Sequence, residues 1–212
     1  ARLAGSAIQD VAERALGEEV TIGAVTVTYF PPEVGLQGVV ISHRADGQRI
    51  VGAHSVRARF GVKDWRVGIV ELRVERPDVR LHVDADGLRE FRDAVSSGGA
   101  PPKVFPWMGL AVVDGHFRVE GPDFHADIAN IDVHTEDDGR IDLAWGAVEL
   151  KRGLIHERSG PTRLKHVTLG PDRIDIPALA VTFDHLALEG NFSASVGGPL
   201  AGELAITAGL PA

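Results

Sequence analysis

The chain has 212 residues, of which 44% are hydrophobic and 25% are charged, which is enough apolar mass for one folded domain or two small ones. Its 30 acidic and 22 basic residues give a formal net charge of -8, and this disfavours a nucleic-acid partner because the phosphate backbone would be repelled. The sequence contains no cysteine, which excludes disulfides, thiolate nucleophiles and the usual structural zinc sites.

No stretch of the sequence is long enough to cross a membrane as a helix. The longest uncharged runs, such as "VFPWMGLAVV" at residues 104–113, fall short of the roughly 20 apolar residues that a spanning helix needs. Because the sequence begins at Ala1 and not at a methionine, we expect a fragment or a processed chain from which an upstream signal or anchor has been removed.

The first predicted element is an amphipathic helix within residues 1–17. Residues 6–16 place Ile8, Val11 and Leu16 at helical spacing, with Ser6 as the expected N-cap and Gly17 as the stop signal.

After this helix, most of the chain alternates apolar and polar residues with a period of two, which is typical of strands that bury one face. Asp-Gly and Gly-Gly pairs between these runs predict turns, and the lack of a regular strand and helix alternation disfavours a nucleotide-binding fold. We therefore expect a mainly β protein, an antiparallel meander curled into an open groove. Its expected parts are a first β-rich part at 18–95 with a short helix near 87–95, a Ser/Gly/Pro-rich linker at 96–107, and a second β-rich part at 108–212 that continues the same sheet.

The stretch "VERPDVRLHVDADG", residues 74–87, is predicted to be a strand followed by a turn. Pro77 indicates an edge position or a bulge, and Val79, Leu81 and Val83 are expected to face inward. The Asp86-Gly87 pair is then expected to turn the chain into the short helix.

The same stretch contains a D-x-D-G motif, at Asp84 and Asp86, that invites a calcium hypothesis. The motif lacks the third acidic ligand and the bidentate Glu that a twelve-residue calcium loop requires, because "LREF" follows Gly87. The structural interpretation, a strand end with a capping turn, is the one we adopt.

No catalytic motif is visible elsewhere in the sequence. There is no G-x-S-x-G, the glycine pairs do not precede a phosphate-binding helix, and no two histidines have the helical zinc spacing. Trp65, Trp107 and Trp145 are expected in the core. We therefore expect no enzyme, no metal site and no cofactor. The histidines, expected at exposed strand positions, are His43, His54, His82, His116, His125, His134, His156, His166 and His185.

Three phrases together resemble the N-terminal region of AsmA-like proteins, the bacterial envelope group that includes TamB. They are "EEVTIGAVTVTYFPPEVGLQGVVIS" at 18–42, "VRARFGVKDWRVGIVELRVERPDVRLHVDADG" at 56–87 and "MGLAVVDGHFRVEGPDFHADIANIDV" at 108–133. The resemblance covers residues 5–133. It implies a periplasmic protein, anchored in the inner membrane by a helix missing here, whose sheet forms an apolar groove similar to that of chorein-type bridge proteins. Members of the group are implicated in phospholipid movement and in outer-membrane protein assembly.

The residues are compatible with this role on their own terms. A sheet with one apolar face must cover it with a second sheet, a helix or a guest, and few helices are available here. Our first hypothesis is a non-enzymatic lipid-binding or lipid-transfer module whose partners are a phospholipid or other acyl lipid, the membrane and other envelope proteins. The expected groove residues are Val25, Val27, Leu72, Val74, Val79, Leu81, Phe117, Val119, Ile128, Ile131, Leu143, Trp145, Ile174, Ile176, Val181 and Phe183.

Two alternatives remain open at this point. The chain could be a closed β-sandwich with a structural or protein-interaction role in outer-membrane protein assembly, in which the apolar faces of two layers meet each other. It could also be a metal-dependent or carbohydrate-active enzyme on a β scaffold that uses Asp84, Asp86 or the histidines.

Overall fold

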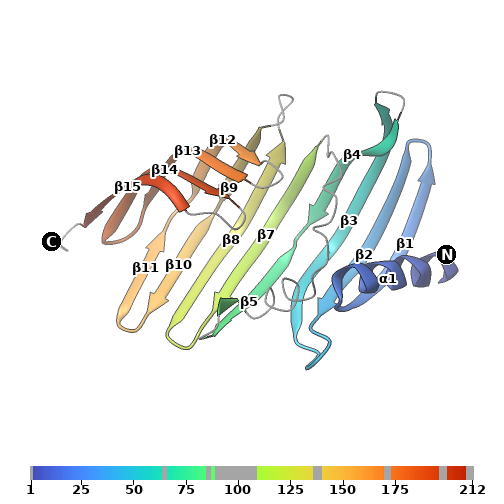
Figure 1. Ribbon diagram of the computed structural model, residues 1–212, viewed down its shortest axis with the longest axis horizontal. Helices are drawn as coiled ribbons and strands as arrows, with labels where there is room; N and C mark the ends of the chain where they lie inside the picture. The colour runs from blue at the N-terminus through green and yellow to red at the C-terminus, as the bar shows by residue number, and fades with distance from the viewer. Residues whose placement is uncertain are drawn as a thin grey trace.

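The computed structural model describes residues 2–63, 66–84, 87–88, 109–135, 140–169, 173–195 and 200–208. In these ranges the chain forms one helix and a single 15-stranded sheet, so the protein is mainly β, as its alternating sequence predicts. Figure 1 shows a broad twisted sheet that runs from β1 to β11, with strands β12 to β15 gathered at one end.

The helix α1 spans Arg2–Leu16, which is longer than predicted. Ser6 therefore lies inside the helix, and its prediction as the N-cap is wrong, because Leu3 and Ala4 are good helix formers that extend the helix toward the N-terminus. The predicted stop is confirmed: Gly17 has a φ of 75° and donates its N–H to Glu13 O at 2.9 Å. Figure 1 shows α1 beside the lower ends of β1 and β2.

The first six strands come from the part of the chain before residue 89, and β1 to β4 pair antiparallel in chain order. Their bounds are β1 Glu19–Tyr29, β2 Pro32–Ser42, β3 Arg49–Lys63, β4 Arg66–Glu75, β5 Asp78–Asp84 and β6 Gly87–Leu88.

The other nine strands follow residue 109 and pair antiparallel with one another. Their bounds are β7 Leu110–Glu120, β8 Phe124–Thr135, β9 Ile141–Trp145, β10 Ala147–Arg152, β11 Ile155–Ser159, β12 Thr162–Leu169, β13 Arg173–Thr182, β14 Leu186–Ser195 and β15 Leu200–Ala208.

The two parts of the chain join through parallel pairing, which corrects the expected antiparallel meander. Strand β7 runs parallel to both β4 and β5, with Leu72 opposite Leu110 and Val79 opposite Phe117. A parallel pair needs a crossover of a dozen or more residues, and the stretch between β6 and β7 supplies that length.

The short helix expected near 87–95 is wrong where the structure describes that stretch. Gly87 and Leu88 form strand β6 and pair with Asp84 and Val83. Several other predictions lie outside the described residues and stay untested. They concern the rest of that stretch, the linker expected at 96–107, Asp86, Trp65 and Trp107.

A line of interruptions crosses the long strands at one level. β4 and β5 lie end to end against β3 in one register, with Arg76 and Pro77 between them. β9 and β10 lie end to end against β8 in the same way, with Gly146 between them. We call this line the seam, and its residues are Gly23, Gly38, His54, Arg76, Pro77, Asp114, Asn130, Gly146, Gly160 and Pro161.

The apolar alternation changes parity at the seam. In β3 the apolar residue after Ala53 is Val56, so this strand makes an odd step instead of a step of two. Several seam residues have positive φ, including Arg76 at 48° and Asn130 at 55°. A residue in that conformation interrupts the pleat and changes the direction of the side chains that follow, as in a β-bulge.

The C-terminal end of the sheet curls back on itself. Ser159 in β11 forms an isolated antiparallel bridge with Phe183, which lies just after β13. Glu157 accepts hydrogen bonds from the backbone N–H of His185 and lies 3.0 Å from its Nδ1. These contacts bring the β13–β14 turn against β11, so that β13 and β14 form a second layer over β8 to β10.

Two apolar clusters fill the space between these layers. One is built on Ile141, Leu164 and Val167, the other on Val148, Val181 and Phe183, and Trp145 and Leu179 pack against both. Trp145 and Val148 lie on opposite sides of the seam, three residues apart, yet they pack into the same cluster. The odd step at the seam therefore keeps apolar side chains on one face of the sheet.

Candidate functional site

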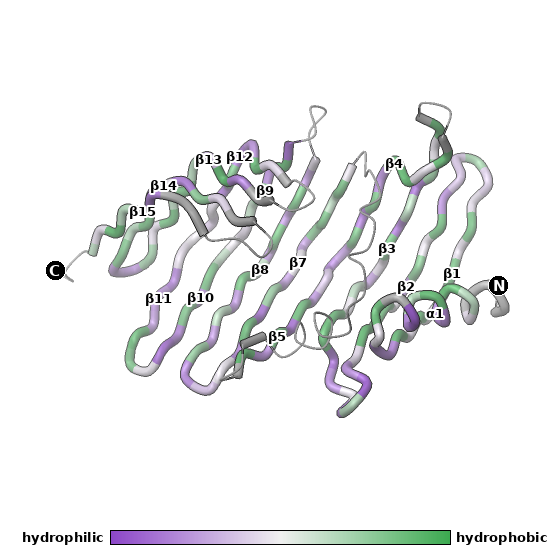
Figure 2. Tube along the Cα trace, viewed as in Figure 1, coloured by the Kyte–Doolittle hydropathy of each residue, from purple (hydrophilic) through white to green (hydrophobic). Residues whose placement is uncertain are grey.

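The central strands carry an apolar face on one side of the seam, formed by β3, β4 and β7. Val56 lies opposite Val74, and Val74 lies opposite Val112. Directly paired residues point to the same face, so these side chains form one row, and Leu72 with Leu110 belongs to the next. Figure 2 shows the alternation of hydrophobic and hydrophilic residues along these strands.

The apolar face continues on the other side of the seam, in β5, β7 and β8. Val79 pairs with Phe117, and Phe117 pairs with Ile128. Leu81 and Val119 form the next row, in which Leu81 is buried. Leu81, Val79 and Val83 were all predicted to face inward. Leu81 is buried, as this prediction requires, while Val79 and Val83 are half-buried.

The expected groove residues divide into two groups. One group packs into the clusters of the C-terminal end, where its apolar surface contacts other side chains of this chain: Ile128, Leu143, Trp145, Ile176, Val181 and Phe183. The other group lies on the first seven strands: Val25, Val27, Leu72, Val74, Val79, Leu81, Phe117 and Val119. Ile131 is half-buried in β8, at the register irregularity beside the seam, and the side chain of Ile174 in β13 lies outside the described part.

The opposite, polar strand positions carry carboxylates surrounded by basic residues, an arrangement that the sequence analysis missed. Glu75 accepts hydrogen bonds from Arg73 at 3.1 Å and Ser55 at 2.9 Å, and Arg57 lies 3.1 Å away. The hydrogen bond from Arg73 is the main reason that the pKa of Glu75 is lowered from its ordinary value.

A second network joins β5, β7 and β8. Arg118 donates to Asp127 at 3.0 Å, and His116 Nε2 lies 2.6 Å from the same carboxylate. Burial raises the pKa of Asp127, but the hydrogen bonds from His116 and Arg118 outweigh it, so the net shift is downward. Asp78, from the neighbouring strand, pairs with Arg80 at 3.0 Å.

A third network lies at the β10–β11 hairpin. Glu149 contacts Lys151 at 3.0 Å, Arg158 at 2.9 Å and His156 at 2.6 Å. The hydrogen bond from Lys151, followed by those from Arg158 and His156, lowers the pKa of Glu149 to about 2.

These three networks favour the ionised form of each carboxylate, which suits ion pairing between strands better than proton transfer. Each carboxylate is held ionised by cationic partners, whereas a general acid or base at neutral pH needs a pKa shifted the other way. Among the described residues, no group of three or more His, Asp or Glu side chains could hold a metal ion. Asp84 ends strand β5, and its proposed calcium partner Asp86 lies outside the described residues.

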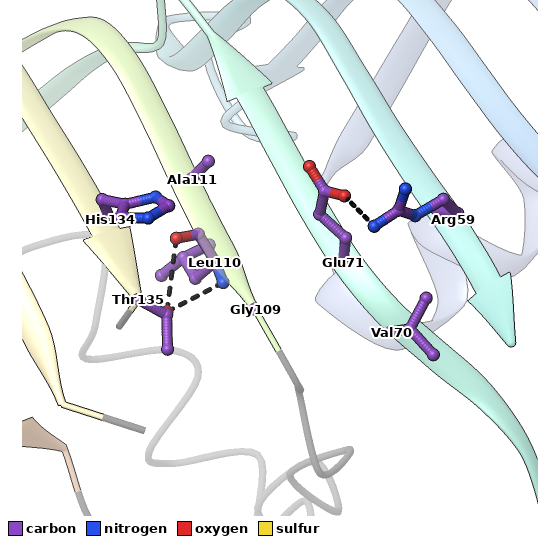
Figure 3. Close-up of a pocket in the computed structure, with 8 residues that line it drawn as sticks. All are labelled: Arg59, Val70, Glu71, Gly109, Leu110, Ala111, His134 and Thr135. Carbon is purple, nitrogen blue, oxygen red and sulfur yellow. Dashed lines mark hydrogen bonds and ion pairs between the residues drawn. The ribbon is translucent and has the colours of Figure 1, made fainter. Parts of the chain in front are cut away.

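A cavity of about 260 Å³, lined by both polar and apolar residues, lies where β4 meets β7. Figure 3 shows Arg59 and Glu71 pointing toward one another on one side of it, with His134 on the other. The ion pair measures 2.6 Å, and Thr135 Oγ1 accepts a hydrogen bond from Leu110 N at 2.9 Å. The cavity therefore contains paired polar groups and no nucleophile with an adjacent base.

The fold and these faces define a mainly β protein whose one sheet separates an apolar from a polar side. No protein-family model matches the chain, and no curated protein matches it in sequence. The resemblance of residues 5–133 to AsmA-like proteins stays a prediction. The described part of the chain contains no helix that is long and apolar enough to span a bilayer.

Proposed function

We propose that this chain is a non-enzymatic lipid-binding or lipid-transfer module of the AsmA-like type, with acyl chains held against the apolar face of β3 to β8. The proposal includes the periplasmic location, the inner-membrane anchor and the envelope partners that the resemblance implies. The observation that carries it is the apolar face itself, which continues across the seam from Val56 and Val74 to Val79 and Phe117.

The energy of such binding follows from apolar area alone. An acyl chain of about fifteen methylenes transfers from water with about 0.8 kcal/mol each, or on the order of 12 kcal/mol before the costs of ordering. Half-buried valines and leucines in successive rows provide apolar contact along the chain without a specific polar site. The distance between neighbouring strands, about 4.8 Å, is close to the width of one alkyl chain.

A specific observation also favours the alternative, a structural or protein-interaction β-sandwich that acts in outer-membrane protein assembly. At the C-terminal end, Trp145, Val148, Val181 and Phe183 meet in a packed cluster between two layers. If the whole apolar face were closed in this manner, the protein would have no surface for an acyl chain.

The test compares two neighbouring residues of β4 that point to opposite faces. Val74→Gln places an amide on the apolar face, and Arg73→Gln places the same side chain on the polar face. We expect Val74→Gln to weaken the uptake of a fluorescent fatty-acyl phospholipid about tenfold, because the lost burial of a valine is worth about 1.5 kcal/mol or more, while Arg73→Gln changes uptake less than twofold.

Thermal unfolding followed by circular dichroism establishes that both variants are folded. Native mass spectrometry of the purified wild-type chain provides the second measurement, since a carrier is expected to retain phospholipid. An unmodified chain that takes up no labelled lipid, and that is equally stable with and without lipid, would support the sandwich in place of the carrier.

A further inference from the structure

The apolar rows of the central face continue beneath the second layer at the C-terminal end. Phe117 in β7 pairs with Ile128 in β8, and Ile128 pairs with Val148 in β10. Directly paired residues point to the same face, so Val79, Phe117, Ile128 and Val148 form one row across four strands. Ile128 and Val148 pack in the cluster beneath β13, so the second layer covers one end of this row.

The rows end on β11 at polar residues that are nevertheless buried. Val148 of the first row pairs with Ser159, and Leu150 of the next row pairs with Glu157. Ser159 is 6% exposed and Glu157 is 7% exposed. A carboxylate is rarely buried to this extent without partners, because its transfer out of water is costly.

Ser159 and Glu157 both contact the second layer. Ser159 forms the isolated antiparallel bridge with Phe183. Glu157 accepts a hydrogen bond from the backbone N–H of His185 at 3.0 Å and lies 3.0 Å from its ring Nδ1. These two contacts, which we call the latch, fasten the turn after β13 to β11.

The strands β13, β14 and β15, which we call the lid, form a three-stranded unit joined to the rest of the sheet by a short ladder. β14 pairs with β13 on one side and with β15 on the other (Figure 1). In the described part of the chain, β13 pairs with β12 at just two positions, Thr168 with Asp175 and Leu169 with Ile174. This junction lies near the start of β13 and the latch lies just after its end, as in a flap hinged on one side and fastened on the other.

The lid covers the rows with apolar side chains of its own. Val181 and Phe183 pack with Val148, and the partly buried Leu186 and Leu188 pack against the same cluster. Hydrophobic contact is not directional, so an acyl chain can replace these side chains on the rows. When the latch opens, the carboxylate of Glu157 regains water, so its release costs less than the loss of a contact that water cannot replace.

We propose that the lid moves away from β8 and β10, about the β12–β13 junction, when an acyl chain takes its place on the covered part of the apolar rows. In the closed form Val181 and Phe183 occupy that part, so the lid is an autoinhibitory element that limits the length of acyl chain accepted by the face. The inference rests on the proposed function and deepens it, because it assigns a regulatory role to the C-terminal layer.

A disulfide that holds the lid closed tests this proposal, and the chain contains no cysteine that would compete. Ser159→Cys/Phe183→Cys joins the lid to β11 at the antiparallel bridge, where paired Cα atoms lie about 4.5–5.5 Å apart, within the range that a disulfide spans. Ala180→Cys/Glu189→Cys, an exposed pair between β13 and β14, is the matched control, because its disulfide stays within the lid.

The measurement is the binding of labelled phosphatidylcholine with acyl chains of about sixteen or about six carbons, because apolar binding energy grows with each buried methylene. The oxidised Ser159→Cys/Phe183→Cys protein should bind the long-chain probe at least about tenfold more weakly than its reduced form, since lost contact with two methylenes already amounts to that factor. The short-chain probe should bind equally to both forms. The control variant should bind each probe equally when oxidised and when reduced.

Hydrogen exchange of the wild-type chain provides a measurement that needs no substitution. The backbone N–H of His185 belongs to the latch, so the peptide that contains it should exchange at least about fivefold faster with the long-chain probe than without it. Equal long-chain binding by the oxidised and reduced forms, or unchanged exchange at the latch when the long-chain probe is bound, overturns the lid and leaves the carrier function. A wild-type chain that binds neither probe removes the carrier function, and the role of the lid with it.

Discussion

Single carboxylates on the polar strand positions interact with several cations at once. Glu149 in β10 is the clearest case, because its three basic partners come from its own strand and from β11 across the hairpin. Opposite charges on directly paired strands support that pairing, so the network helps fix the register of a hairpin that belongs to the edge of the sheet.

Glu149→Gln should therefore change the acid sensitivity of the protein. The pKa of Glu149 is about 2 in the folded chain and its ordinary value is 4.5, so its ionised form stabilises the fold above pH 4.5 and this contribution is lost as the pH falls toward 2. We expect the free energy of unfolding of the variant to fall less steeply between pH 4.5 and 2 than that of the wild-type chain.

Urea unfolding at a series of pH values measures this slope. Glu189→Gln, at an exposed position of β14, serves as the control and should leave the slope unchanged. An identical slope for Glu149→Gln and the wild-type chain would show that the network contributes nothing to acid stability.

At the scale of the elements, the seam determines which face each strand presents. Asn130 has a φ of 55°, and the backbone N–H of Gly146 donates to the carbonyl of Ala129 beside it. Asparagine tolerates positive φ better than most residues, while a β-branched side chain adopts it only with strain. Asn130 therefore has a backbone role that its exposed position alone does not reveal.

We expect Asn130→Val to lower the free energy of unfolding by about 1–2 kcal/mol, the cost of a left-handed conformation, and Asn130→Gly to be close to neutral. His134→Val, an exposed substitution in the same strand at ordinary φ, should change stability by less than about 0.5 kcal/mol. Chemical unfolding of the three variants measures the differences. If Asn130→Val and His134→Val were equally stable, the seam would not depend on the conformation of this residue.

At the scale of the whole molecule, the two ends of the sheet differ in how they are covered. At the C-terminal end, β13 and β14 lie over β8 to β10, and the two apolar clusters fill the space between them. At the N-terminal end, α1 contacts β1, and Glu13 accepts a hydrogen bond from the backbone N–H of Val20 at 3.3 Å.

Hydrogen exchange should reveal this difference between strands that are otherwise alike. β2 and β12 each pair with a neighbour on both sides, but only β12 contributes buried residues, Leu164 and Val167, to a cluster. We expect the amides of β12 to exchange at least about tenfold more slowly than those of β2, because local opening of β12 must expose the cluster. Exchange mass spectrometry of peptides from the two strands measures the rates, and equal protection would contradict a stability concentrated at the C-terminal end.

Several features were correct from the sequence because they depend on local chemistry. The helix ends at Gly17 because glycine readily adopts positive φ. At Pro77 the sequence indicated an edge position or a bulge; the edge alternative is wrong, because β4 and β5 on either side of Pro77 both pair with β3 and with β7. An odd step at the seam was also visible in the sequence, because Ala53 and Val56 lie three apart with only His54 and Ser55 between them.

Other features depend on residues far apart in the sequence. They follow only from the order and register of the strands. Examples are the parallel pairing of β7 with β4 and β5, the cluster that joins Val148 to Phe183, and the three cations around Glu149. The expected groove list failed to separate Trp145 and Val181, which pack in a cluster, from Val74 and Val79 on the central face, because alternation gives the same signal for both.

The sequence by itself determined that this protein is mainly β, where its first helix ends, and which residues of each strand are apolar, because propensity and alternation act within a few residues. Only the tertiary structure decided which strands are neighbours, how the seam keeps one face apolar, and which part of that face the chain covers with its own second layer. The reason is physical: the direction of a side chain is set by its own backbone, whereas its burial is set by the segments that pack against it.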